Sequence, residues 1–254
     1  MKALLDAELL KLRSTRATAL LVLATLVLVV LTIATTVPGV IEENSALSLD
    51  DPALLASVVG NGFGAPQVMM TLLGVLAFTQ EFRYGTVTST YLGEPRRTRV
   101  FVAKGLSLAL ASVVITTLTL AVTIPLSVAL IRSQDGGVTV GAQFWQTVAA
   151  GFVVIAAYGV IGVAIGALIP NQIAAVVGVL IWMTAVEQMV IPYLPEVGRW
   201  MPFAAANSLM QLAPLYGFDH GQLLSVASGG LVLAGYTAAA VGLALRITPR
   251  RDVL

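Results

Sequence analysis

Six long apolar stretches limit the folds open to this chain more than any other feature of the sequence. A helix needs about 20 apolar residues to cross about 30 Å of hydrocarbon. The stretches lie at 17–37, 65–79, 105–131, 144–169, 173–194 and 222–245. Only 11% of the residues are charged, against about 25% in soluble domains. The sequence therefore predicts one domain over residues 1–254, an all-α polytopic membrane protein with six transmembrane helices.

The distribution of Lys and Arg predicts how these helices are oriented. Nearly all of the 14 basic residues lie before the first stretch, within 80–104 or after the last stretch, whereas 38–64 has acids and no base. Cytoplasmic loops retain Lys and Arg, so both termini and 80–104 are expected in the cytoplasm of a bacterial cell, with the chain in its cytoplasmic (inner) membrane. An even number of crossings must then separate the first two basic segments. The short, glycine-interrupted stretch 65–79 is therefore required as a second span.

The first 16 residues carry an amphipathic pattern. Leu5, Leu9 and Leu12 recur at helical spacing, while Glu8 and Lys11 lie on other faces. This pattern predicts an interfacial helix on the inner leaflet, with a frayed terminus as the alternative. A cleaved signal peptide is disfavoured, because the apolar run that follows is too long and lacks an Ala-x-Ala-like site.

The segment 81–99, between the second and third spans, has a mixture of charges. A positive-inside anchor explains its arginines, but it does not explain Glu81 and Gly85. A glycine there permits a tight turn, and an acid offers a fixed charge for a basic group of a cytoplasmic partner. Residues 87–92 are predicted to form a short helix or turn.

The residues of this segment carry a resemblance to a known family. They include, in order, Glu81, Gly85, Thr86, Pro95, Arg99 and Lys104. A Glu followed by Gly-Thr, a Pro-x-x-Arg-like element and a Lys resembles the type 2 (ABC-2) permease subunits of ATP-binding-cassette exporters, in an actinobacterial-like branch. The resemblance covers the whole chain, although the second span departs from it in being short and interrupted.

The resemblance implies that this segment forms a short cytoplasmic coupling helix, seated on a separate ABC ATPase subunit. The candidate coupling residues are Glu81, Arg83, Gly85, Thr86, Pro95, Arg96, Arg97 and Arg99. A second permease copy or a paralogue would complete the transport pathway. The chain has no GxxxxGK[ST] loop, so ATP and Mg are expected on the ATPase, and no catalytic, metal or cofactor site is expected in this chain.

Two further features lie within the predicted spans. Glu187, next to Gln188, is either part of a transport pathway or gate, or a structural group that snorkels or pairs with Arg199. Gly159, Gly162 and Gly166 lie on one helix face. They predict close helix packing within the subunit or, as the alternative, a dimer seam.

The segment 195–221 is apolar but contains three prolines, which predicts short re-entrant helices covered by protein. Together these patterns favour a permease subunit that exports an amphipathic drug, lipid or peptide. A stand-alone channel or ion-coupled transporter, and a non-transporting immunity or assembly protein, remain alternatives. Nucleic acid is not an expected partner, because topology already accounts for the basic residues.

Overall fold

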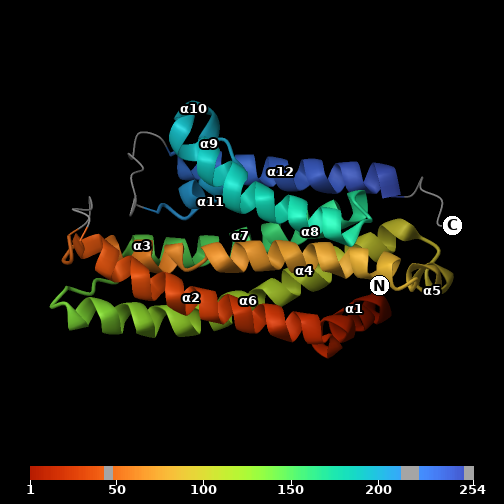
Figure 1. Cartoon of the computed structure of the whole chain (residues 1–254), viewed down its shortest axis with the longest axis horizontal. Helices are drawn as coiled ribbons and strands as arrows, with labels where there is room; N and C mark the ends of the chain where they lie inside the picture. The colour runs from red at the N-terminus through yellow and green to blue at the C-terminus, as the bar shows by residue number, and fades with distance from the viewer. Residues whose placement is uncertain (43–47, 213–222, 249–254) are drawn as a thin grey trace.

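The computed structural model is a bundle of long helices that lie side by side along its longest axis (Figure 1). It describes residues 1–42, 48–212 and 223–248, and among these no strand is present. Six helical segments are long and apolar enough to cross a membrane. The chain is thus an all-helical, multi-pass membrane protein, as the sequence predicts.

The described residues form a series of helices in chain order. They are α1 (Lys2–Ser14), α2 (Arg16–Glu42), α3 (Leu54–Asn61), α4 (Gly64–Arg83), α5 (Val87–Gly93), α6 (Arg97–Ser133), α7 (Ala142–Leu168), α8 (Gln172–Ile181), the π-helical turn η1 (Trp182–Val186), α9 (Glu187–Tyr193), α10 (Pro195–Gly198), α11 (Pro202–Leu209) and α12 (Val226–Ile247). Each predicted span corresponds to one of these helices or to a continuous group of them.

The second span is longer than the predicted 65–79. It consists of α3 and α4 and covers Leu54–Arg83. The glycines between the two helices do not end the crossing, because Gly62 and Phe63 both keep right-handed helical backbone angles. The sequence-based boundary is wrong here, since glycine permits a turn but does not require one.

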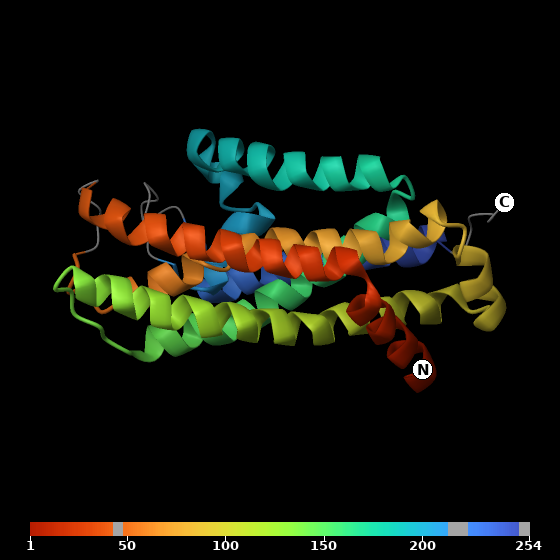
Figure 2. The same ribbon diagram turned by 60° about the horizontal axis from the view of Figure 1, so that its bottom comes forward.

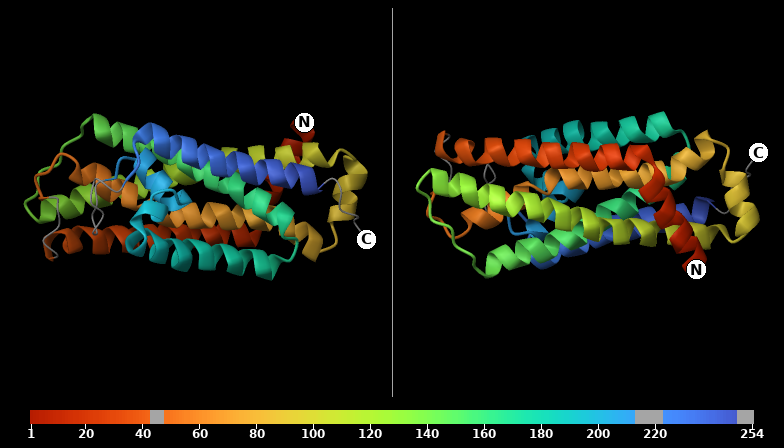
Figure 3. Two further views of the ribbon diagram at one scale, coloured as in Figure 1. Left: turned by 90° about the horizontal axis from the view of Figure 1, so that it is seen from above. Right: turned by 90° about the horizontal axis from the view of Figure 1, so that it is seen from below.

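The elements next to the predicted coupling segment gather at one end of the bundle. Figures 1 and 2 show the N-terminus, α5 and the end of α12 at this end, which we call the α5 end. The helices α3 and α10 lie toward the opposite end (Figure 1). From below, α1 runs obliquely across α6 (Figure 3), and the two helices are in contact.

The glycine face of α7 packs against α4 of the same chain. A Cβ atom at Gly162 would lie 2.2 Å from the Thr71 carbonyl oxygen, and one at Gly166 would lie 2.6 Å from that of Val75. The backbones of the two helices can approach this closely only because the side chain is absent. This is the packing within the subunit that the sequence favours. The alternative, a dimer seam on Gly159, Gly162 and Gly166, is wrong, because α4, including the Met70 side chain beside Gly159, already covers that face.

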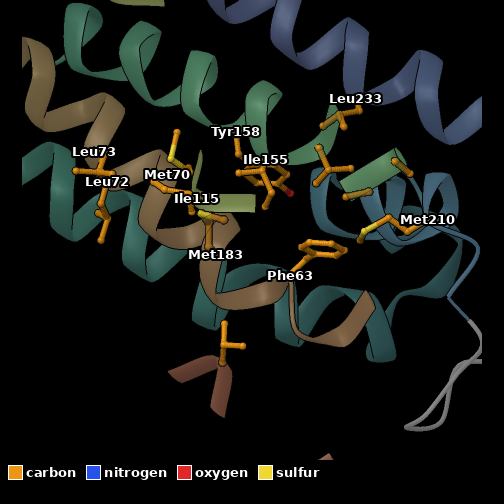
Figure 4. Packing of buried hydrophobic residues seen from close by; sticks show 14 of the residues in the cluster. Phe63, Met70, Leu72, Leu73, Ile115, Ile155, Tyr158, Met183, Met210 and Leu233 are labelled. Atoms are coloured by element: carbon orange, nitrogen blue, oxygen red, sulfur yellow. The ribbon is translucent and has the colours of Figure 1, made fainter. Parts of the chain in front are cut away.

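The core lies between these central helices, and the outer helices present apolar side chains outward. Phe63, Met70 and Tyr158 are among the buried residues (Figure 4). In contrast, Leu20 on α2 and Leu231 on α12 are 66% and 74% exposed. Exposed apolar side chains on long helices are what a surrounding bilayer requires.

The predicted segment 195–221 contains two short helices in its described part. The helix α11 packs against α12 and α7, and Ala204, Ala205 and Ala206 are buried there. The helix α11 is therefore covered by protein, whereas Val197 on α10 is 51% exposed. Residues 213–221 lie outside the described residues.

Candidate functional site

Four charged side chains meet at the α5 end of the bundle. Glu8 and Lys11 come from α1, Glu81 from the last turns of α4 and Lys104 from α6. Lys104 Nζ lies 2.9 Å from Glu8 Oε2 and 2.7 Å from Glu81 Oε1, and Lys11 Nζ lies 2.7 Å from an oxygen of each carboxylate. We call this group the charge cluster. It connects three helices, of which α1 is far from α6 in the sequence.

Lys104 is the centre of the charge cluster. Its side chain is fully buried, and its third donor bonds the Ala77 carbonyl oxygen at 2.8 Å. The ammonium also lies 5.7 Å from the centre of the Phe78 ring. An unpaired buried charge costs several kcal/mol. The two carboxylates and the carbonyl are therefore needed for Lys104 to remain in the interior.

Lys11 lies at the accessible edge of the same cluster. Partial burial lowers the pKa of Lys11, but hydrogen bonds from its ammonium to Glu8 and Glu81, together with their negative charge, outweigh this effect. The net result is a pKa raised above the usual 10.5. The charged form of Lys11 is thus stabilised by the cluster.

The sequence-based interpretation placed two members of the cluster differently. Glu8 was expected on a face of α1 other than the leucine face, but it is buried and bonds Lys104 of α6. Glu81 was expected to offer its charge to a partner protein, but it is 7% exposed and bonds lysines of its own chain. The i,i+3 spacing of Glu8 and Lys11 was the available indication of a shared face.

The chain turns sharply after α4. Gly85 has a φ of +69°, a left-handed conformation that glycine adopts without strain, as the sequence predicts for this position. Its amide donates to the Phe82 carbonyl oxygen. Two residues later α5 begins, and Ser89 and Thr90 donate their hydroxyl hydrogens to the Thr86 carbonyl oxygen. The turn therefore sets the direction of α5.

A second set of contacts fixes the connection from α5 to α6. Glu94 accepts bonds from the Arg96 amide and from Arg99 Nη1, at 3.2 and 3.4 Å. Arg97 lies over the Tyr91 ring at 5.0 Å and donates to the Thr248 carbonyl oxygen at 3.3 Å. Arg97 and Arg99 therefore stabilise the turn around Pro95, besides contributing positive charge on this side of the membrane.

The outer surface of this segment remains accessible. Tyr84 and Leu92 are 69% and 79% exposed, and the predicted coupling residues Arg83, Gly85, Thr86, Pro95 and Arg96 are also exposed. The sequence-based interpretation missed Tyr84 and Leu92, because apolar residues next to a membrane are not unusual by themselves. The α5 end thus combines the buried charge cluster with an exposed, partly apolar helix.

Glu187 and Gln188, the two candidate residues for a pathway or gate, differ in burial. Glu187 is 1% exposed and accepts a hydrogen bond from Trp182 Nε1 at 3.0 Å, while its second oxygen has no partner. Gln188 is exposed. Arg199 lies over the Trp200 ring at 5.9 Å, and no ion pair joins it to Glu187 in the described part of the chain. The predicted pairing of Glu187 with Arg199, and its snorkelling, are therefore wrong.

The described residues include no group of three His, Asp or Glu side chains that could hold a metal ion. The structure thus defines a six-span helical membrane protein with a buried charge cluster below a short, exposed helix. No protein-family model and no curated protein matches this chain.

Proposed function

We propose that this chain is the transmembrane permease subunit of an ATP-driven exporter of the ABC-2 type. In this proposal α5 is the coupling helix, and it binds a separate ATPase subunit that holds ATP and Mg. The chain itself has no phosphate-binding loop and is not an enzyme. A second permease copy or a paralogue completes the pathway for an amphipathic substrate.

The charge cluster is the observation that supports this proposal most strongly. Glu81 and Lys104, the first and last residues of the family-like pattern, bond each other directly at 2.7 Å. This bond joins the end of α4 to the start of α6, on either side of α5. Glu8 joins α1 to the same lysine. A force applied to α5 is therefore passed to two membrane-spanning helices together. This bond gives a physical reason why a Glu and a Lys stand at the two ends of the pattern.

The exposed surface of α5 supplies the complementary half of the argument. Leu92 and Tyr84 present apolar surface next to Arg83 and Arg96. Interfaces between proteins commonly combine aromatic and arginine side chains. The Lys and Arg distribution favours a cytoplasmic location for this surface, on the side where an ATPase would be found.

The coupling step follows from populations of states. ATP closes an ATPase dimer, and the closed dimer binds one arrangement of two coupling helices better than another. Only this difference in affinity can shift the permease between its states. Because the charge cluster joins α4, α6 and α1, a displacement of α5 moves these three helices together.

The test is copurification of the full chain with its ATPase subunit, identified as a separate chain with a phosphate-binding loop. We expect Gly85→Leu to abolish this association and substrate-stimulated ATP hydrolysis, while membrane insertion is unchanged. A left-handed conformation costs an L-residue roughly 1–2 kcal/mol, so the turn changes and α5 is misdirected. Gly105→Leu is the control, because a Cβ there also meets open space but the backbone is not left-handed.

Unchanged association of the Gly85→Leu variant would contradict the role of α5. Purification of an active transporter without any ATPase would favour the stand-alone transporter instead.

A further inference from the structure

A second feature of the chain has no role in the coupling proposal. A cavity of about 440 Å³ lies between α7, α8, η1 and α12. Its lining is mostly apolar, and Glu187 is the only charged residue among the described residues that line it. The Tyr158 hydroxyl and Glu187 Oε2 are both buried in this lining without a hydrogen-bond partner. Buried polar atoms are nearly always satisfied, so these two atoms are available to bind a partner that occupies the cavity.

The π-helical turn explains how the carboxylate is held. The Glu187 amide bonds the carbonyl oxygen of Trp182, five residues earlier. In an α-helix, residues at this spacing point in different directions, whereas the wider π turn brings them onto one face. The Trp182 indole can therefore hold one Glu187 oxygen at 3.0 Å. The other oxygen remains available to the cavity.

The rim of the cavity is open to the surroundings of the bundle. Trp182 and Tyr236 are 45% and 42% exposed, and Ile169 is 42% exposed. All three also line the cavity. Ala175 and Glu187 lie along it about 18 Å apart, at about 1.5 Å per helical residue. A molecule dissolved in the bilayer can thus enter between α8 and α12 with its apolar body along the cavity.

We infer that this cavity, which Trp182 and Tyr236 also line, binds an amphipathic organic monocation whose positive centre lies at Glu187. The carboxylate supplies the opposite charge, and aromatic faces attract cations. A single acid without a basic neighbour selects against anions, because a like charge in an apolar site is strongly unfavourable. The inference rests on the proposed function only in treating this ligand as the exported substrate.

The test uses two ions of equal size and opposite charge. Tetraphenylphosphonium and tetraphenylborate are titrated separately into the full chain in nanodiscs of zwitterionic lipid, with empty nanodiscs subtracted. We expect saturable binding of tetraphenylphosphonium and none of tetraphenylborate. Glu187→Gln preserves the side-chain shape and the acceptor for Trp182, and it should weaken tetraphenylphosphonium binding by roughly tenfold or more.

A second variant tests the cavity without changing its charge. Gly178 lines the cavity, and a Cβ there would meet no atom within 4 Å. Gly178→Leu should therefore fill the space and prevent binding while the chain still folds. Gly235→Leu is the matched control, because its Cβ is equally free but the residue does not line the cavity.

Equal binding of both ions, or unchanged affinity in Glu187→Gln and Gly178→Leu, would overturn the inference. The cavity would then hold a lipid chain or face a second copy of this chain. Because binding is measured without an ATPase, its failure is distinct from failure of the coupling proposal. Loss of ATPase association with intact cation binding would refute only the proposed function.

Discussion

Among the described residues, the buried carboxylates Glu8 and Glu81 are compensated by lysines, whereas the buried carboxylate Glu187 has no basic partner. In the charge cluster, each of Glu8, Lys11, Glu81 and Lys104 has a partner of opposite charge within 3 Å. At the cavity, Glu187 has no basic partner: it accepts a hydrogen bond from the Trp182 indole and interacts with the Phe203 amide, and its Oε2 is unpartnered. A compensated cluster holds helices together, whereas an uncompensated carboxylate is available to a ligand. The predictions below test this difference through the free energy of unfolding.

The largest expected effect comes from Lys104→Met. This change leaves the Glu8 and Glu81 carboxylates with Lys11 alone, and removing one partner of a buried ion pair typically costs about 3–5 kcal/mol. We expect a large fall in the thermal unfolding midpoint of the purified chain. Arg96→Ala, an exposed change at the same end, is the control.

A double variant sharpens this prediction. Adding Glu81→Gln to Lys104→Met removes one of the uncompensated charges and should restore part of the lost stability. If the two changes are simply additive, Glu81 and Lys104 do not act as a unit, and the proposed role of the charge cluster in joining the helices is not supported.

A smaller effect is expected for Lys11→Met, because the Lys11 side chain is 48% exposed. Solvent screens such pairs, so the loss should be roughly 1 kcal/mol or less. The pKa of Lys11 is raised above 10.5, and its contribution is therefore complete below that pH and lost as pH rises through the raised value. The gap in unfolding midpoint between wild type and Lys11→Met should narrow in strongly alkaline solution. A gap that widens there would contradict the assignment.

The smallest effect on stability is expected for Glu187→Gln. No ionic partner is lost, and an amide oxygen can still accept the Trp182 bond. The free energy of unfolding should change by less than about 1 kcal/mol, and it can rise because a lone buried carboxylate is unfavourable. The measurement is the same thermal midpoint without added ligand. A loss as large as that of Lys104→Met would show that Glu187 has a structural role and would remove the contrast.

The sequence predicts most of the spans from hydropathy, which is a property of each segment alone. The second span needed the Lys and Arg distribution as well, and its start was still misplaced. It also predicts the strain-free turn at Gly85, since a positive φ favours one residue type. It does not predict the charge cluster, because Glu8 and Lys104 meet across 96 positions and only the packing of α1 on α6 brings them together. The sequence also does not predict that Glu187 lacks a basic partner, because this depends on the π turn and on the direction of the Arg199 side chain.

The central claim is that the α5 end faces the cytoplasm and binds an ATPase. The chain has no cysteine, so single cysteines can be labelled without interference. We expect a membrane-impermeant maleimide to label Leu92→Cys in inverted vesicles but not in intact cells, and bound ATPase to protect it. Val140→Cys, exposed at the opposite end, should show the reverse pattern. Labelling of Leu92→Cys in intact cells, or no protection by the ATPase, would contradict the account.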